Sequence, residues 1–261
     1  MVGALDDMRR HAGSAAVLFD IDGVLSPIVP HAADARVPAD TLDLLAALRD
    51  RYLLAGVISG RGMADVDRMV PVPGLARGGN HGLEMAEPGT DAHLVPEAAE
   101  PVRVLRAFVE GLSPDQLAAH GAWMEDKGAS VSLHYRQAPG PAATGAWLRA
   151  TVLPAAVDAG LRTRDGKMIL ELIPHVDVDK GTALRALVQA AGARHVLYVG
   201  DDHTDADAWR RMRAMRDAGE IDTAHCVLAD GPEVDPAVRA VADATVDGTD
   251  GVQSLMRMLA Q

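Results

Sequence analysis

Cysteine is almost absent from this chain, since Cys226 is the only one among 261 residues. A lone cysteine cannot form a disulfide within the chain, and it leaves no set of thiolates to hold a metal ion. Aromatic residues are also scarce, at 3% of the sequence. Leu, Val, Ile, Ala and Met must therefore fill the core, and with 48% hydrophobic residues the composition is that of a globular protein.

Basic residues are outnumbered by acidic ones, which gives a formal net charge of −12. This excess argues against binding to nucleic acid or to an anionic membrane surface. No apolar run is long enough to span a membrane, and the N-terminus lacks the pattern of a signal peptide. We therefore expect a cytoplasmic protein, in which an anionic substrate would be met by a metal ion or by a few placed Lys and Arg side chains.

Strand and helix patterns alternate at both ends of the chain. Continuous apolar strands are expected at residues 17–19, 53–58, 195–199 and 226–228. Helices are expected after a cap at Asp40 and at residues 63–70, 181–191, 206–218 and 235–242. This rhythm is typical of an α/β fold with a doubly wound parallel sheet.

The middle of the chain has a different pattern. Helix patterns lie at residues 102–112 and 146–159. One alternating segment, 129–135, lies between them, and another, 168–172, follows them. Alternation predicts an antiparallel sheet with one face covered by helices. We therefore predict an α+β domain at residues 87–173, inserted into an α/β core made of residues 1–86 and 174–261.

Two aspartates one residue apart, Asp20 and Asp22, directly follow the apolar run 15–19. Neither has a Lys or Arg beside it in the sequence to neutralise it. Like charges at close range in a partly desolvated place are tolerated mainly when they share a cation or a proton. This strand end therefore predicts a site.

Further polar groups stand at predicted strand ends or helix starts. Ser59 follows the second strand, Asp201 and Asp202 follow the strand 195–199, and Lys180 begins a helix. Ligands of an open parallel sheet gather at the carboxyl ends of its strands. Taken singly, these residues are equally typical of turns and helix caps. Taken together, they are consistent with Mg²⁺-dependent phosphoryl transfer, with carboxylate oxygens on the metal, a carboxylate nucleophile, a second carboxylate as acid and base, and Ser and Lys on the phosphate.

These segments resemble the four motifs of the phosphatases in the haloacid dehalogenase (HAD) superfamily, namely Asp20-x-Asp22-Gly23-Val24, Ser59-Gly60-Arg61, Lys180-Gly181 and Gly200-Asp201-Asp202. The resemblance implies a HAD-like Rossmannoid parallel-sheet core with an α+β cap. It implies Asp20 as nucleophile and Asp22 as general acid and base. The phosphate-binding groups implied are Ser59, Gly60 and Lys180. The Mg²⁺ ligands implied are Asp20, the backbone carbonyl of Asp22, and Asp201, with Asp202 and Asp205 in support.

The predicted cap resembles that of the trehalose-6-phosphate phosphatases. The segments that carry the likeness are 125–136, which begins Glu-Asp-Lys-Gly and ends His-Tyr-Arg, the Asn-His-Gly-Leu-Glu of 80–84, the Gly-Asp-Asp-His-Thr-Asp of 200–205, and 166–171. The resemblance implies that Glu125, Lys127 and Glu171 bind the sugar, the alternative being a Glu–Lys pair on a solvated sheet. His134 and Arg136 either contact substrate or pack at the junction of cap and core.

Two further residues are candidates for substrate binding. Arg61 either reaches the phosphate or ties down its own loop, and His81 either contacts substrate or belongs to a hinge or interface.

The expected function is that of a Mg²⁺-dependent phosphatase that hydrolyses trehalose 6-phosphate through an aspartyl-phosphate intermediate, with functional coupling to a trehalose-phosphate synthase. A related sugar or pseudo-disaccharide (cyclitol) phosphate is the alternative substrate. The alternative of another class is an inactive sugar-phosphate-binding partner of a synthase, which should have lost a carboxylate from the set Asp20, Asp22 and Asp201. All three are present.

Overall fold

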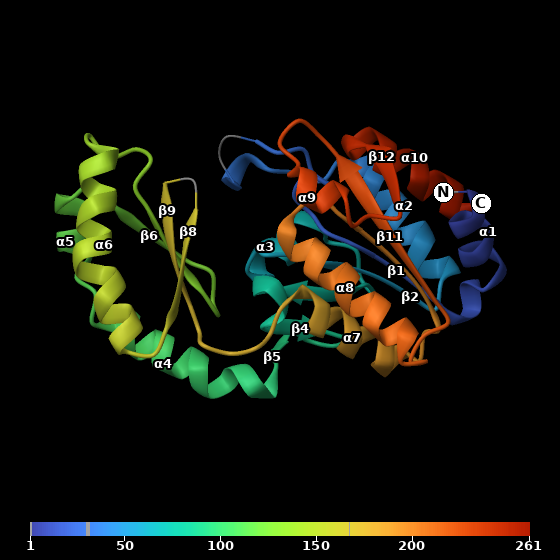
Figure 1. Ribbon diagram of the computed structural model, residues 1–261, viewed down its shortest axis with the longest axis horizontal. Coiled ribbons are helices and arrows are strands. Elements are labelled where there is room, and N and C mark those ends of the chain that lie inside the picture. Colours follow the sequence, from blue (N-terminus) through green and yellow to red (C-terminus); the bar gives the residue numbers. More distant parts are fainter. Residues whose placement is uncertain (1, 30–31, 167) are drawn as a thin grey trace. The chain divides into compact units, whose positions relative to one another are not determined.

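The computed structural model describes residues 2–29, 32–166 and 168–261, which divide into two compact units (Figure 1). The first unit combines the chain up to His93 with Val178–Gln261, and the second is the uninterrupted stretch Leu94–Asp177. The predicted insertion at 87–173 starts and ends a few residues earlier. Lys167, within the 166–171 segment, lies outside the described residues.

An eight-stranded sheet runs through the first unit in the order β12-β11-β10-β1-β2-β3-β4-β5. Neighbours from β12 to β3 are parallel, and β4 is antiparallel to β3. The strands are β1 (Ala15–Phe19), β2 (Leu54–Ile58), β3 (Ala76–Gly79), β4 (Glu84–Ala86), β5 (His93–Leu94), β10 (His195–Gly200), β11 (Thr223–Asp230) and β12 (Ala244–Asp247). The predicted α/β class with a parallel-dominated sheet is confirmed.

Helices cover both faces of this sheet (Figure 1). Val17 and Phe19 of β1 pack into a cluster with α2 and α10, while α7 and α8 pack against each other on the other face. Alternate residues of a strand point to opposite faces, so Tyr198 lies on the α8 side. The helices are α1 (Val2–Arg10), α2 (Ala39–Arg51), α3 (Met63–Met69), α7 (Lys180–Ala191), α8 (His203–Asp217), α9 (Pro236–Arg239) and α10 (Gly248–Ala260), with 3-10 turns η1 (Ala12–Ser14), η2 (Ala32–Asp34) and η3 (Asn80–Gly82).

The second unit has its own antiparallel sheet in the order β6-β7-β9-β8. Leu133 and Leu170 on one face pack into a cluster with residues of the helices of this unit. The elements are η4 (Pro96–Ala98), α4 (Ala99–Glu110), α5 (Pro114–Ala119), β6 (Trp123–Asp126), β7 (Val131–His134), α6 (Pro141–Asp158), β8 (Arg162–Gly166) and β9 (Ile169–Ile173). The opposite face is polar and carries the predicted sugar-binding residues.

Several element boundaries differ from the predictions. Pro38, not Asp40, is the residue before α2, and Asp40 lies in its first turn without capping it. Met168 has a left-handed φ of 64° and lies in a turn before β9. The helix expected at 235–242 is the single turn α9. None of the helices in the described part of the chain combines the length and apolar character needed to cross a bilayer.

Candidate active site

The first strand delivers Asp20 to the carboxyl edge of the sheet, where its side chain is buried. The backbone N–H of Asp20 donates to the carbonyl of Val199 at 2.9 Å, which continues the pairing of β1 with β10. Because the two strands run parallel, Gly200 and Asp201 reach the same edge. Burial raises the pKa of Asp20 well above its usual value, although the Lys180 ammonium opposes the rise.

Lys180 is the charge centre of this edge. Its Nζ lies 3.0 Å from Asp20 Oδ2 and 2.8 Å from Asp205 Oδ1, and its side chain is only 1% exposed. Burial alone would lower the pKa of Lys180, but the charges of Asp20, Asp205 and Asp202 outweigh it and raise the pKa above its ordinary value. Lys180 is therefore a permanently charged counter-ion for the carboxylates around it.

Asp205 is held by a complete set of donors. Its Oδ1 accepts from Lys180 and from the Tyr198 hydroxyl at 2.7 Å, and its Oδ2 accepts from the backbone N–H groups of Asp201 and Asp202 at 2.8 and 3.2 Å. No atom of Asp205 is accessible to solvent. This arrangement fixes the loop that follows β10 and carries Asp201 and Asp202.

Asp202 caps α8, because its side chain accepts from the N–H groups of Thr204 and Asp205 at 2.8 and 3.0 Å. Although partial burial opposes it, the Lys180 ammonium and the hydrogen bond from Thr204 lower the pKa of Asp202 to about 2. Asp202 can therefore cap α8 and still lie beside the predicted site.

Asp201 lies beside the first motif. A Cβ placed on Gly23, whose φ is +75°, would come within 2.0 Å of Asp201 Oδ2, so only glycine leaves room for this carboxylate. Burial and the charges of Asp205 and Asp202 raise the pKa of Asp201 to about 8. A carboxyl with such a pKa marks a place where a cation would be strongly favoured.

Three carboxylates form a set that fits a divalent cation. One oxygen each of Asp20, Asp201 and Asp205 lies within 4.8 Å of the others. Oδ1 of Asp20 is buried and accepts no hydrogen bond within the described chain. An oxygen-only donor set with an orphaned buried oxygen suits a hard cation such as Mg²⁺. Each carboxylate oxygen of Asp205 already accepts two hydrogen bonds. Asp20 and Asp201 are therefore the better candidates to bind the ion directly.

Both carboxylate oxygens of Asp22 accept hydrogen bonds from Arg61. The guanidinium donates from Nε to Asp22 Oδ2 at 2.6 Å and from Nη2 to Oδ1 at 2.7 Å. The Arg61 backbone N–H also donates to the hydroxyl of Ser59, which is buried at the end of β2. Two roles were considered for Arg61, namely reaching the phosphate and fixing its own loop. In the structure its side chain contacts Asp22, the candidate acid and base, and so links the first motif to the second.

The segment with His81 packs against the second motif, Ser59-Gly60-Arg61. Asn80 and His81 both have left-handed φ values, 49° and 58°, and a Cβ on Gly60 would lie 2.6 Å from the His81 ring. Glu84 accepts from the Met63 N–H at 3.1 Å and from the Asn80 side chain. Glu84 therefore fixes the loop, while His81 lies against Gly60 of the predicted phosphate-binding turn.

A cavity of about 680 Å³ lies beside Asp201 and Asp202. Its other walls come from Gly23, Pro27, Ile28, His203, the segment 229–235, Val238, Gly248 and Thr249. Among the residues that the structure describes, no Lys or Arg lines this cavity, and its acidic lining residues are Asp201, Asp202, Asp230, Glu233 and Asp235.

The polar face of the second unit brings together four of the predicted sugar-binding residues. His134 Nε2 lies 2.7 Å from Glu125 Oε2, and Lys127 Nζ donates to Glu171 Oε1 at 3.0 Å. Glu125 lies on β6 and Glu171 on β9, and β7 lies between these two strands. Arg136 is exposed beyond the end of β7.

Two residues at these sites were not predicted from the sequence. Trp123 is about half exposed on β6, and its ring stacks on His134 with centroids 4.2 Å apart. Tyr198 was counted as part of an apolar strand. A tyrosine in an otherwise aliphatic buried strand was the available signal, since a buried hydroxyl needs a partner.

Comparisons with known proteins agree on one family. A family profile described as trehalose-phosphatase matches residues 18–233. The chain is 36% identical over 219 residues to the trehalose-phosphate phosphatase of Mycobacterium avium (strain 104), covering 82% of this chain and 54% of that protein. The chain thus spans about half the length of the curated relatives it matches.

Solved structures show the same fold. A trehalose-6-phosphate phosphatase related protein has a TM-score of 0.74 at 21% identity and covers 94% of this chain and 96% of its own. A haloacid dehalogenase-like hydrolase from Bacteroides thetaiotaomicron has a TM-score of 0.63 at 14% identity and covers 93% of this chain and 98% of its own.

Proposed function

Since this chain belongs to the trehalose-phosphatase family, we propose that it hydrolyses trehalose 6-phosphate to trehalose and phosphate. The observation that carries the proposal is the joining of Asp20, Lys180, Asp201 and Asp205 at one sheet edge, with Asp22 close behind on the first loop. A synthase that makes trehalose 6-phosphate would supply the substrate.

Asp20 is the proposed nucleophile. Its Oδ2 lies 3.0 Å from Lys180 Nζ, which fixes the side chain at the end of β1. One carboxylate oxygen would attack phosphorus and displace the sugar oxygen, forming an aspartyl-phosphate. The ammonium of Lys180 would place a positive charge beside the reacting group. A bound Mg²⁺, held by Asp20, Asp201 and a backbone oxygen, would add the charge that keeps Asp20 ionised and stabilises the phosphoryl oxygens.

Asp22 is the proposed proton carrier. It would protonate the sugar oxygen as the first bond breaks, and then take a proton from the water that hydrolyses the aspartyl-phosphate. The two hydrogen bonds from Arg61 hold both its oxygens. Arg61 would therefore orient Asp22 for both proton transfers.

Phosphate binding is assigned to Ser59, Gly60 and Lys180. Ser59 and Lys180 are both buried, and buried donors with fixed positions stabilise a phosphoryl group without reorganising. Sugar binding is assigned to Glu125, Lys127, Glu171 and His134, whose carboxylate, ammonium and imidazole groups offer acceptors and donors to hydroxyl groups.

The test is a phosphate-release assay over trehalose 6-phosphate, sucrose 6-phosphate, glucose 6-phosphate and a pseudo-disaccharide phosphate, each with Mg²⁺ and with EDTA. We expect the highest kcat/KM for trehalose 6-phosphate and no release in EDTA. Asp20→Asn should abolish turnover and keep the fold, checked by circular dichroism. Full turnover by Asp20→Asn would refute the mechanism, and a higher kcat/KM for another phosphate would refute the substrate.

A further inference from the structure

Three pairs of aromatic rings are stacked in the part of the chain that the structure describes. They are His11–His195, His120–Trp147 and Trp123–His134, with ring centroids 3.9, 3.9 and 4.2 Å apart. The pairs differ in what surrounds them, and the third includes one of the predicted sugar-binding residues, His134.

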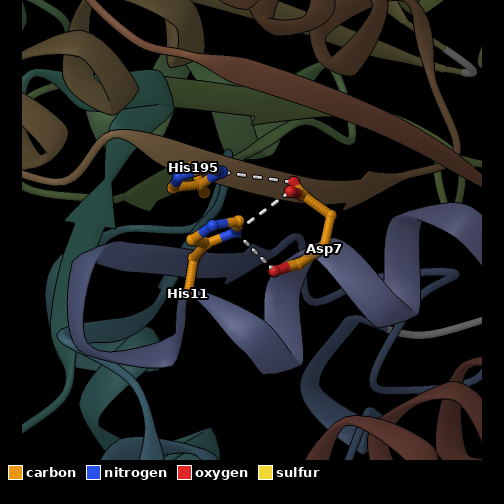
Figure 2. A group of neighbouring side chains, drawn as sticks. All are labelled: Asp7, His11 and His195. Carbon is orange, nitrogen blue, oxygen red and sulfur yellow. Dashed lines mark hydrogen bonds and ion pairs between the residues drawn. The ribbon is translucent and has the colours of Figure 1, made fainter.

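The first pair belongs to a hydrogen-bond network in the first unit. Figure 2 shows the rings of His11 and His195 face to face, with the carboxylate of Asp7 reaching toward both. Nδ1 of His11 lies 3.1 Å from Asp7 Oδ1, and Nδ1 of His195 lies 3.3 Å from Asp7 Oδ2 and 3.0 Å from the Thr223 hydroxyl. These nitrogens already have partners, and the network joins α1 to β10 and β11.

Trp123, in the third pair, is open to solvent. The residue is 49% exposed, and it is the aromatic one among the large apolar side chains that are exposed in the described chain. Trp147, in the second pair, is only partly exposed and packs against the apolar core of the second unit. Isolated aliphatic side chains are ordinary on a surface, whereas aromatic rings beside a few placed polar groups are typical of ligand sites.

Trp123 lies on the polar face of the second unit. It is the first residue of β6 and pairs with His134 of β7. Met124 packs against the apolar core of the unit. Alternate residues of a strand point to opposite faces, so Trp123 and Glu125 both point away from that core. The indole and the predicted sugar-binding groups therefore share one surface.

One face of the indole is already occupied. The imidazole of His134 lies parallel to it, with an angle of 8° between the ring planes. Nε2 of His134 lies 2.7 Å from Glu125 Oε2, and this contact fixes the imidazole against the indole. Because His134 covers one face and about half of Trp123 is still exposed, the exposed part is the opposite face and the edge of the ring.

Hydrogen-bonding groups lie next to the indole. Glu125 follows Trp123 by roughly 7 Å along β6. Lys127 comes next on the same side, and its Nζ donates to Glu171 Oε1 at 3.0 Å. A pyranose ring has apolar C–H groups on its faces and hydroxyl groups around its rim. An apolar platform with carboxylates and an ammonium beside it therefore suits both parts of such a ring.

We propose that the exposed face of Trp123 stacks on a pyranose ring of the substrate, while Glu125, Lys127 and Glu171 bind hydroxyl groups at its rim. This inference rests on the proposed function, in which the polar face of the second unit binds the sugar. The electropositive C–H groups of the ring would lie against the electron-rich face of the indole. Trp123 is thus a specificity-determining residue that favours sugar phosphates over small acyclic phosphate esters.

The first test compares the steady-state kinetics of Trp123→Ala and Trp123→Phe, in the whole chain with Mg²⁺. We expect Trp123→Ala to raise KM for trehalose 6-phosphate at least about fivefold with little change in kcat, because a platform binds the ground state and the transition state alike. Trp123→Phe keeps a smaller ring and should have a smaller effect. Relative to glycerol phosphate, kcat/KM for trehalose 6-phosphate should fall by a similar factor in Trp123→Ala.

Val157→Ala is the matched control, because it removes an exposed apolar side chain on α6 of the same unit. It should leave KM for trehalose 6-phosphate unchanged. A fall in kcat without a rise in KM for Trp123→Ala would mean that the indole only positions His134, and would overturn the proposal.

A second measurement does not depend on turnover. Acrylamide quenches the fluorescence of exposed indoles, and Trp209 is buried, so the quenchable emission that Trp123→Phe loses belongs to Trp123. In Asp20→Asn protein, which should bind substrate without cleaving it, we expect trehalose 6-phosphate to protect this emission from acrylamide. Inorganic phosphate, which has no ring, should not protect it.

The outcomes separate this inference from the proposed function. An unchanged KM in Trp123→Ala, or unprotected emission at saturating trehalose 6-phosphate, would overturn the stacking role and leave the phosphatase activity standing. Equal protection by inorganic phosphate would show that Trp123 is covered without a sugar, and would overturn it as well. If the unchanged protein hydrolyses no sugar phosphate, the proposed function fails, and the acrylamide measurement alone then decides the role of Trp123.

Discussion

At the scale of single residues, the active-site edge depends on one ammonium among several carboxylates. Lys180 contacts Asp20 and Asp205 at 3.0 and 2.8 Å, and all three side chains are buried. A buried ion pair adds little compared with an apolar replacement of both partners, but removing one partner leaves an uncompensated charge. Lys180 therefore stabilises the fold by neutralising the buried carboxylates of Asp20 and Asp205.

We expect Lys180→Met to lower the free energy of unfolding by about 3–5 kcal/mol at neutral pH and to abolish turnover. The same change in an Asp205→Asn background should cost clearly less, because one buried charge is already gone. Urea unfolding of the two single variants and the double variant measures the coupling. Equal losses in both backgrounds would contradict this account of Lys180.

Asp201 predicts a pH dependence of stability in metal-free protein. Its folded pKa of about 8 lies above its ordinary value, so between about pH 4 and pH 8 the folded state holds a proton that the unfolded state releases. The free energy of unfolding should therefore fall as pH rises through this window. Urea unfolding in EDTA at several pH values checks this. Asp201→Asn should flatten the slope, and Asp207→Asn, which removes an exposed carboxylate on α8, should leave it unchanged.

At the scale of elements, α7 begins with a side-chain cap, whereas α2 lacks the cap that was expected. Asp179 precedes α7, and its side chain accepts from the Thr182 N–H at 2.7 Å in a reciprocal capping box. Asp40 was expected to cap α2 and makes no such bond. We expect Asp179→Ala to cost about 1 kcal/mol of unfolding free energy and Asp40→Ala less than about 0.5. Thermal or urea unfolding decides this, and equal costs would count against the cap at Asp179.

The turn after β1 gives a second prediction at this scale. Gly23 and Gly89 both have left-handed φ values, +75° and +78°, but only a Cβ on Gly23 would collide, with Asp201. Gly23→Ala should therefore displace Asp201 and cut phosphate release at least about tenfold, beyond a backbone cost of about 1 kcal/mol. Gly89→Ala has the backbone cost without the collision. Similar turnover in both variants would show that Asp201 is not held as the geometry indicates.

The elements also show what could be predicted from the sequence. Apolar runs identified β1, β2 and β10, and the polar residues that follow them were placed at one edge because parallel strands end together. The strands β3 (Ala76–Gly79) and β8 (Arg162–Gly166) were missed, since glycines and charges interrupt their pattern. The pairs Arg61–Asp22 and Asp7–His195 join residues far apart in sequence, and only the fold brings them together.

At the scale of the whole molecule, two separate cores predict two unfolding steps. The first unit packs around β1 and β10, and the second around Leu133 and Leu170. Trp209 is buried in the first unit, while Trp123 and Trp147 belong to the second. In urea, we expect the fluorescence of Trp209→Phe and that of Trp123→Phe/Trp147→Phe to change at different midpoints. Coincident midpoints for both proteins would mean that the units unfold as one.

The second unit is a single uninterrupted stretch, and the chain leaves and re-enters the first unit to make it. Insertions, deletions or wholesale replacement within such a stretch leave the register of the main sheet untouched. Selection can therefore act on the polar face around Glu125 and Glu171 without disturbing Asp20 or Lys180. In an evolving family, the two units can then change at independent rates.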